Sequence, residues 1–440
     1  MLFRYLFFTP YITKTCTINK LNRTLSTLPQ LSSEKYGVKR KEFGVLKNDD
    51  LKFFQSLLSN ERVLTDESEV LPFNIDWIKN CRGALVCEAG CILENLDNYA
   101  RERNLIMPLD LGAKGSCQIG GNISTNAGGI RLLRYGNLQG TVLGVEAVKA
   151  DGSVIDCLRT LKKDNTGYHL KHLFIGSEGT LGVVTKVAIQ CPSLPKSVNL
   201  GFFGLESFDA VLQLYKSAKS SLGEILSAFE MADSLSIGTT VKNLKLTNPI
   251  GEYPFYVLIE THGSDVEHDS DKLSRFLSRE MDSGLIVNGT VTAEETKMKS
   301  IWNIRESIAA AALDTGYMFK YDVSVPLRSY YELVHVLRRR LRDVDCKVYG
   351  YGHVGDGNIH INVVVPEYSK EVYALLEPFI FEEVSKHKGS ISAEHGIGFR
   401  KPQYIHYSKD QTSLQLMRDM KRIMDPNGIL NPYKVLPDMS

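Results

Sequence analysis

The sequence predicts an α+β protein whose C-terminal part is an antiparallel sheet backed by helices. After Pro192 and Pro195, strand-like stretches are interleaved with amphipathic stretches of helical period, an order typical of that class. Before the two prolines the chain differs in character, because ten of its 35 glycines lie between Gly112 and Gly152. With 440 residues, the chain is long enough for two domains or more.

The composition narrows the choice of partners. Hydrophobic residues make up 43% and charged residues 23% of the chain, as in soluble globular proteins. The formal net charge is only +1, so no basic excess is available to neutralise phosphates, and we expect no nucleic-acid partner. The apolar stretch at residues 1–12 is too short to span a bilayer, and no later stretch is long enough, so we expect no transmembrane segment.

The first 33 residues have the composition of a mitochondrial presequence. They contain Arg4, Lys14, Lys20 and Arg23 among many serines and threonines, and the first acidic residue is Glu34. This basic, hydroxyl-rich pattern predicts import into the mitochondrial matrix. The alternative is a disordered tail that carries no targeting signal.

Strand and helix patterns can be followed in chain order. Leu93, Leu96 and Ala100 give the segment after Gly90 one apolar helical face, and the pair Asp151-Gly152 favours a hairpin turn. The expected elements before Pro192 are a helix over Asp49–Leu58, a strand over Ala84–Glu88, a helix after Gly90, and a hairpin of Val142–Ala150 and Ser153–Cys157. The expected strands beyond it are Val198–Gly204, Pro254–Thr261, Phe319–Val325, Lys347–Tyr351 and Ile359–Val365. The expected helices are Ser207–Ser220, Asp265–Arg279, Ala293–Leu313, Leu327–Leu341 and Tyr368–Lys386, followed by a polar tail.

Two segments carry residues suited to binding. The glycine-rich run Gly112–Gly129 lacks the apolar period of a regular element, and its glycines would let free N–H groups approach a phosphate or a heterocycle. The second segment holds His353 in a glycine-rich loop and His360 on the following strand. Two imidazoles so placed could bind one metal ion, with Asp356 or a distant carboxylate as third ligand. The alternative is a turn-rich loop with two ordinary histidines.

Three motifs agree with one known family. They are Gly115-Ser116 with Ile119-Gly120-Gly121-Asn122 and Thr125-Asn126-Ala127-Gly128-Gly129, then Gly176-Ser177-Glu178-Gly179-Thr180-Leu181-Gly182, and Asp425-Pro426 with Gly428 and Asn431-Pro432. From about residue 34 onward the chain resembles the FAD-linked oxidases of the vanillyl-alcohol oxidase type, and among them the mitochondrial D-2-hydroxyglutarate dehydrogenases. The resemblance implies an N-terminal segment over residues 34–83, the C-terminal half of an FAD-binding domain over 84–196, and an α+β cap domain over 197–440.

The resemblance also implies roles for single residues. Those that would line FAD are Ser116, Gly120, Gly121, Asn122, Thr125, Asn126, Gly128 and Gly129, with Glu178, Gly179, Gly182 and Val183 on the adenine–ribose side and Asn431 from the tail. His353, His360 and Glu394 would bind zinc, although manganese or cobalt would suit these ligands too.

A divalent ion held this way could bind the 2-hydroxyl and the C1 carboxylate of a 2-hydroxy acid and lower the pKa of the hydroxyl. His395 could then take the proton, while the C2 hydride passes to the flavin. Arg305 and Lys320 would bind the remote carboxylate, and Asn362 lies beside the metal ligands. Without the resemblance, Arg305 could be a solvated helix residue, and Glu394 with His395 could cap a loop.

The implied reaction is oxidation of D-2-hydroxyglutarate to 2-oxoglutarate, with electron-transfer flavoprotein as the expected electron acceptor. The resemblance leaves open whether the protein forms a homodimer.

Two departures from the family qualify the implied reaction. Ala309 replaces a threonine usual in the dicarboxylate enzymes, although Ser307 or a water could compensate, so D-lactate or another D-2-hydroxy acid stays an alternative. The chain also passes directly from Asn80 to Ala84, where the family has several dozen residues, including the loop around the FAD diphosphate. An unpaired strand edge should follow, and the alternatives are a truncated product without FAD or a metal-binding interaction module.

Overall fold

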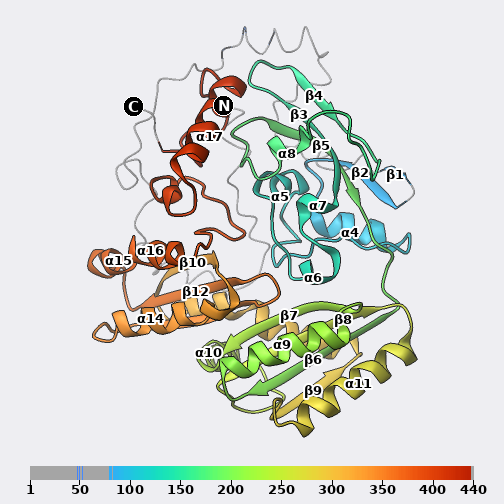
Figure 1. The fold of residues 1–440 in the computed structure, drawn as a ribbon, viewed down its shortest axis with the longest axis vertical. Helices are drawn as coiled ribbons and strands as arrows, with labels where there is room; N and C mark the ends of the chain where they lie inside the picture. Colours follow the sequence, from blue (N-terminus) through green and yellow to red (C-terminus); the bar gives the residue numbers. More distant parts are fainter. Residues whose placement is uncertain (1–46, 48, 50–51, 53–78, 82, 438–440) are drawn as a thin grey trace.

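The computed structural model of the protein describes residues 47, 49, 52, 79–81 and 83–437. The presequence predicted over residues 1–33, most of the segment 34–83 and nearly all of the helix predicted over Asp49–Leu58 lie outside these residues. Two antiparallel sheets organise the described part, with helices packed around them (Figure 1). The predicted α+β class is confirmed.

The five-stranded sheet lies in the N-terminal part of the described chain and has the order β1-β2-β5-β3-β4. Its strands are β1 Lys79–Cys81, β2 Ala84–Glu88, β3 Val142–Val148, β4 Val154–Cys157 and β5 Val183–Gln190, and its helices are α4 Leu93–Arg101, α5 Ile119–Thr125, α6 Leu132–Tyr135, α7 Leu138–Thr141 and α8 Lys171–Phe174. The predicted hairpin is confirmed, since Val148 pairs with Val154. Strand β2, which follows the short passage from Asn80, is paired with β1 over Ala84–Val86 and with β5 along its whole length, so the expected unpaired edge does not lie at this strand.

The glycine-rich run does contain a regular element, which we did not predict. Ile119 and Ile123, four residues apart on α5, are both fully buried in the core of the five-stranded sheet. Gly120 lets this short helix pack closely against Ala89, because a Cβ at position 120 would lie 2.5 Å from the Cβ of Ala89. The apolar signal of two isoleucines was too sparse to reveal the helix.

The seven-stranded sheet has the order β10-β12-β11-β7-β8-β6-β9 and is antiparallel throughout. Its strands are β6 Ser197–Leu205, β7 Leu226–Asp233, β8 Phe255–Gly263, β9 Asn288–Thr292, β10 Tyr317–Ser324, β11 Lys347–His353 and β12 Asn358–Val365. Around it lie α9 Phe208–Leu222, α10 Ser234–Leu244, α11 Val266–Asp282, α12 Glu295–Glu306, α13 Ile308–Leu313, η4 Leu327–Ser329, α14 Glu332–Arg340, α15 Lys370–Leu376, α16 Phe379–Lys386 and η5 Pro402–Tyr407.

Helices cover both faces of this sheet. Helices α9, α11, α14 and α16 contribute to the large core on one face, and α10, α12 and α13 pack on the other. The helix predicted over Ala293–Leu313 is two helices that meet at Ser307, and the one predicted over Tyr368–Lys386 is interrupted around Pro378. No helix in the described part of the chain is long and apolar enough to cross a membrane.

The C-terminal tail returns to the five-stranded sheet. It forms α17 Gln411–Met424, which lies beside that sheet in Figure 1. Lys421 Nζ donates to the carbonyl oxygen of Thr180 at 2.8 Å, so the tail contacts the glycine-rich motif Gly176–Gly182.

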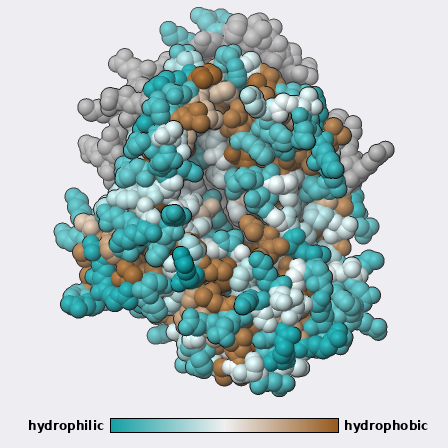
Figure 2. Space-filling view, viewed as in Figure 1, coloured by the Kyte–Doolittle hydropathy of each residue, from teal (hydrophilic) through white to brown (hydrophobic). Residues whose placement is uncertain are grey.

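The visible face of the molecule is mostly hydrophilic, with apolar residues in scattered patches (Figure 2).

Candidate metal and flavin site

The register of four neighbouring strands gathers most of the predicted site on one face of the seven-stranded sheet. Lys320 lies opposite Asn362, Asp322 opposite His360, and His353 opposite Glu230. Directly opposed residues of antiparallel strands project to the same face. The intervening side chains of β12, Ile359 and Ile361, are fully buried in the core of the other face.

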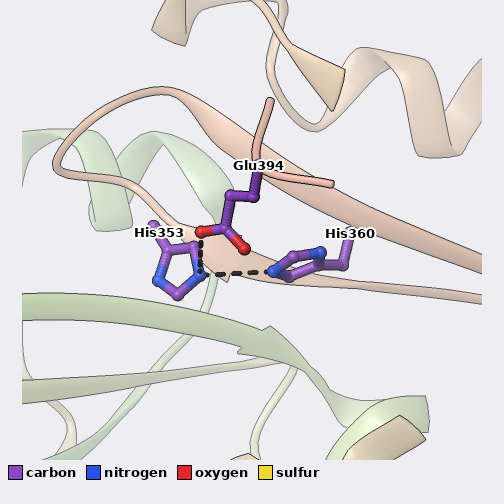
Figure 3. Close-up of side chains that lie close together, drawn as sticks. All are labelled: His353, His360 and Glu394. Atoms are coloured by element: carbon purple, nitrogen blue, oxygen red, sulfur yellow. Dashed lines mark hydrogen bonds and ion pairs between the residues drawn. The ribbon is translucent and has the colours of Figure 1, made fainter. Parts of the chain in front are cut away.

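Three side chains converge at the end of this face (Figure 3). His353 ends β11, His360 lies on β12, and Glu394 lies in the loop between α16 and η5; each offers a ligand atom within 4.8 Å of the other two. The Nε2 atoms of the two histidines are 3.2 Å apart, and Nε2 of His353 is 3.3 Å from Oε1 of Glu394. Asp356 is outside this group, and its carboxylate accepts the backbone N–H of Asn358 at 3.0 Å.

The donor set fits a divalent metal. Ligand atoms 2.0–2.1 Å from a tetrahedral ion lie about 3.3 Å from one another, which matches the two short separations in the cluster. Two imidazole nitrogens and one carboxylate suit zinc and also leave a coordination position open for a substrate.

A buried carboxylate contacts Nδ1 of His353, the ring nitrogen that does not face His360 and Glu394. This Nδ1 lies 2.7 Å from Oε1 of Glu230, whose side chain is almost completely buried. The other oxygen of Glu230 accepts from Nε and Nη2 of Arg305 at 3.0 and 2.7 Å. Burial alone would lower the pKa of His353, but the charges of Glu230 and Glu394 raise it to about 9. Burial raises the pKa of Glu394 to about 7.

A second buried carboxylate, Asp322, organises the loop that carries Glu394 and His395. Its Oδ2 accepts the backbone N–H groups of both residues, at 2.9 and 3.1 Å, and lies 3.3 Å from Nδ1 of His395. Its Oδ1 accepts from Asn358 Nδ2 at 2.7 Å. The His395 side chain itself is two-thirds exposed, so Asp322 fixes one ring nitrogen while the rest of the ring stays accessible.

The predicted substrate residues have unequal surroundings. Lys320 is exposed. Asn362 is buried and donates to the hydroxyl of Tyr351 at 2.8 Å, while Arg305 already has Glu230 as a counter-ion. The hydroxyl of Ser307 donates to Asn303 at 3.1 Å, so in this structure it is engaged away from the role that the family resemblance predicts for a hydroxyl at position 309.

The structure brings the predicted flavin segments together. The backbone N–H groups of Gly176 and Glu178 donate to carbonyl oxygens of Ile123 and Ser124 at the end of α5, at 3.0 and 2.7 Å. Asn431 donates its side-chain N–H to the carbonyl oxygen of Glu178. The residues that this brings to one region are Gly120, Gly121, Asn122, Thr125, Asn126, Gly128, Gly129, Glu178, Gly179 and Asn431.

The remaining predicted flavin residues have other surroundings. Ser116 is exposed in the turn before α5, and Val183 is 45% exposed at the start of β5. Gly182 packs against the ring of Phe174, since a Cβ there would lie 2.6 Å from that ring.

These segments fit part of a bound cofactor. Among the described residues, Oδ1 of Asn122 is buried without a hydrogen-bond partner, and buried acceptors of this kind need a partner. A Cβ at Gly121 would meet no atom of the described part of the chain within 4 Å, so that part leaves the backbone open there. At Gly128 a Cβ would lie 3.0 Å from Cγ of Glu394, so the glycine-rich run directly contacts a candidate metal ligand.

Comparison with known proteins defines the class. Residues 194–435 match the C-terminal domain of FAD linked oxidases, and residues 62–158 match an FAD binding domain. The solved structure of p-cresol methylhydroxylase superposes with a TM-score of 0.64 at 14% identity, covering 83% of this chain and 78% of that one. The fold is therefore that of the FAD-linked oxidases.

Sequence relatives narrow the class further. The mitochondrial D-2-hydroxyglutarate dehydrogenase of Danio rerio is 56% identical over 359 residues, which is 82% of this chain and 67% of that protein. The protein of the same name from Rattus norvegicus is 43% identical, over 92% of this chain and 88% of that protein. The chain belongs to the D-2-hydroxyglutarate dehydrogenase family of oxidoreductases.

The alignment with the rat relative also bears on the short passage from Asn80 to Ala84. It extends over 473 positions, although it includes only 92% of a chain of 440 residues. Several dozen positions of that relative therefore have no counterpart in this chain, and their location between Asn80 and Ala84 stays a prediction.

Sequence reasoning missed Glu230 and Asp322 as parts of the site. Glu230 lies on β7, a strand that we did not predict, and Asp322 was taken only as part of the strand Phe319–Val325. The signal for Asp322 was its position two residues after Lys320 on a predicted strand, which gives both residues the same face.

Proposed function

We propose that this protein oxidises D-2-hydroxyglutarate to 2-oxoglutarate in the mitochondrial matrix, with FAD and a divalent metal ion. The observation that carries the proposal is the contact between Gly128 of the flavin-type segment and Glu394 of the His353–His360–Glu394 cluster. A substrate bound at such a cluster would have its reacting carbon beside the flavin-type segment, as the transfer of a hydride requires.

The metal would be held by His353, His360 and Glu394. When bound there, such an ion would supply Lewis-acid chemistry to the 2-hydroxyl and the C1 carboxylate of the substrate, which would lower the pKa of the hydroxyl. The neighbouring Asn362 could donate a hydrogen bond to the same carboxylate if it released Tyr351. Zinc is the ion that these ligands favour, and manganese or cobalt are the alternatives.

His395 would receive the proton of the 2-hydroxyl. Its ring lies 6.2 Å from the ring of His360, centroid to centroid, so it borders the cluster without being one of the three ligands. The carboxylate of Asp322 at Nδ1 would orient the ring and stabilise its protonated form, which is the arrangement that a general base needs. When bound, FAD supplies the acceptor for the C2 hydride.

The remote carboxylate of the substrate would be bound by Arg305 and Lys320. Arg305 uses Nε and Nη2 to contact Glu230, so its Nη1 would be the donor to the substrate. Lys320 is exposed on the same sheet face and would supply its ammonium group. D-Lactate lacks this carboxylate, so it is the alternative substrate that Ala309 favours. Electron-transfer flavoprotein is the expected acceptor of the electrons.

A second candidate follows from the missing residues between Asn80 and Ala84. Those residues carry the diphosphate loop in the family, so a chain without them could bind metal and yet fail to retain FAD. Such a product would have no dehydrogenase activity.

One experiment separates the two candidates. The purified chain is supplied with FAD and zinc, and reduction of a dye is followed with D-2-hydroxyglutarate or D-lactate. Yellow flavin absorbance that persists through desalting, with faster dye reduction by D-2-hydroxyglutarate, supports the dehydrogenase. Metal without flavin and no dye reduction would leave only the truncated product.

A further inference from the structure

Glu230 contacts two parts of the site that have different tasks. Through Oε1 it bonds Nδ1 of His353, a candidate metal ligand, and through Oε2 it bonds Arg305, a candidate substrate anchor. The strands fix this arrangement, because Glu230 on β7 lies directly opposite His353 on β11. Its side chain is 2% exposed, so water does not compete for these bonds.

The contact with His353 determines which ring nitrogen can bind a metal. A carboxylate at Nδ1 holds the proton there and leaves the lone pair on Nε2, the atom that faces His360 and Glu394. The contact with Arg305 uses Nε and Nη2 of the guanidinium, so Nη1 takes no part in the bonds to Glu230. The ring of Tyr351, 4.9 Å from the guanidinium carbon, supports the group from a different direction.

We propose that Glu230 is a positioning residue that prepares His353 for the metal and Arg305 for the remote carboxylate of the substrate at the same time. The inference rests on the proposed function and adds a coupling between its two binding sites. Loss of the Glu230 charge should weaken metal binding and should also reduce the preference for a dicarboxylate over a monocarboxylate. No bond to the substrate itself is required of Glu230.

The test compares two buried carboxylates. Glu260 on β8 is also almost completely buried and also bonds an arginine and a histidine, Arg131 and His262, but it has no contact with the cluster. Zinc affinity of the wild type, Glu230→Gln and Glu260→Gln is measured against a chromophoric chelator, without FAD or substrate. We expect Glu230→Gln to bind zinc about 10–100-fold more weakly, the range for losing a partner of a ligating histidine, and Glu260→Gln to bind it as the wild type does.

The second reading uses substrates on the enzyme supplied with FAD and saturating zinc. The ratio of kcat/KM for D-2-hydroxyglutarate to that for D-lactate should fall in Glu230→Gln and stay unchanged in Glu260→Gln. If the glutamine variant does not fold, Glu230→Asp replaces it in both measurements, because aspartate keeps the charge on a side chain too short to make both contacts. Glu230→Asp should also weaken zinc binding and lower the ratio of the two kcat/KM values.

The outcomes separate this inference from the proposed function. Wild-type zinc affinity in a folded Glu230 variant overturns the coupling while leaving the proposed function intact, and so does equal weakening by Glu260→Gln. A wild-type chain that binds no zinc contradicts the metal site of the proposed function and overturns the coupling with it.

Discussion

At the scale of single residues, the site separates side chains that would hold a metal from a side chain that would move a proton. His353 and His360 have their Nε2 atoms 3.2 Å apart, whereas the ring of His395 is two-thirds exposed. Asp322 lies near Nδ1 of both His360 and His395, at 3.7 and 3.3 Å. Neighbouring histidines therefore have different surroundings on one sheet face. This difference makes their roles separable by mutation.

Replacing His395 with alanine should lower turnover without removing the metal. Loss of a general base costs about 10²–10⁴-fold in rate, while the three ligand atoms stay in place. His360→Ala should lower metal affinity as well as turnover. Dye-reduction rates and metal content of the desalted proteins measure the two effects, and His406→Ala, an exposed histidine on η5, serves as the control. Loss of metal in His395→Ala would contradict the assignment of His395 as base.

At the scale of secondary-structure elements, the second glycine-rich motif holds the loop of the metal cluster. The carboxylate of Glu178 accepts the backbone N–H groups of Ile397 and Gly398 at 2.6 and 2.7 Å. Glu178 has a φ of +53°, a backbone conformation that is costly for a residue with a side chain. Gly396 leaves room for the carboxylate, since a Cβ there would lie 2.6 Å from Oε1 of Glu178.

Replacing Glu178 with alanine should therefore loosen the loop that carries Glu394. Each lost bond to a charged group contributes roughly 1.5–3 kcal/mol, so we expect faster hydrogen exchange at Ile397 and Gly398 together with weaker metal binding. Glu178→Gln keeps an acceptor oxygen and should have a smaller effect on both. Unchanged exchange at these two amides in Glu178→Ala would show that the loop is held by other contacts.

The elements also show what sequence patterns can predict. Strands with a clear apolar pattern, such as Ile359–Val365, were predicted to within one residue of their bounds. Strand β7 was missed because Ser227, Glu230 and Asp233 interrupt its apolar residues in the sequence, although all three are buried in the structure. Glu230 was lost with it, and its pairing with His353, 123 residues along the chain, depends on a register that no local pattern contains. Helix α17 was missed because only Leu414 among its residues is fully buried.

At the scale of the whole molecule, a buried ionic network joins the two sheets. Arg131, from the turn before α6, lies 3.0 Å from Glu260 of β8 and 2.7 Å from Asp110. Glu260 also accepts from Nε1 of Trp302 at 3.0 Å. The network therefore holds Asp110 and Arg131, which lie outside the seven-stranded sheet, against strand β8 of that sheet.

Glu260→Gln should destabilise the protein at neutral pH by about 3–5 kcal/mol, the usual cost of breaking a buried pair. Burial alone would raise the pKa of Glu260, but Arg131 and the hydrogen bond with His262 hold it well below its usual range. Its contribution is therefore complete above the unfolded pKa near 4.5 and is lost as pH falls through the lower folded value. Urea unfolding of both proteins at several pH values should show a difference that shrinks in acid, and a constant difference would contradict the ionic origin.

The missing segment between Asn80 and Ala84 leads to the last prediction. The predicted flavin residues come together at Glu178 and Asn431, and His353, His360 and Glu394 lie close enough to hold one ion. The family resemblance predicts, however, that the residues around the FAD diphosphate are among those missing from this chain. Zinc should therefore bind at one ion per chain, while FAD should be retained weakly. Inserting the corresponding residues of the rat relative between Gly83 and Ala84 should raise retained FAD toward one per chain without changing zinc content. Full retention of FAD by the chain as it stands would instead mean that the described segments, with residues outside them, are sufficient for the cofactor.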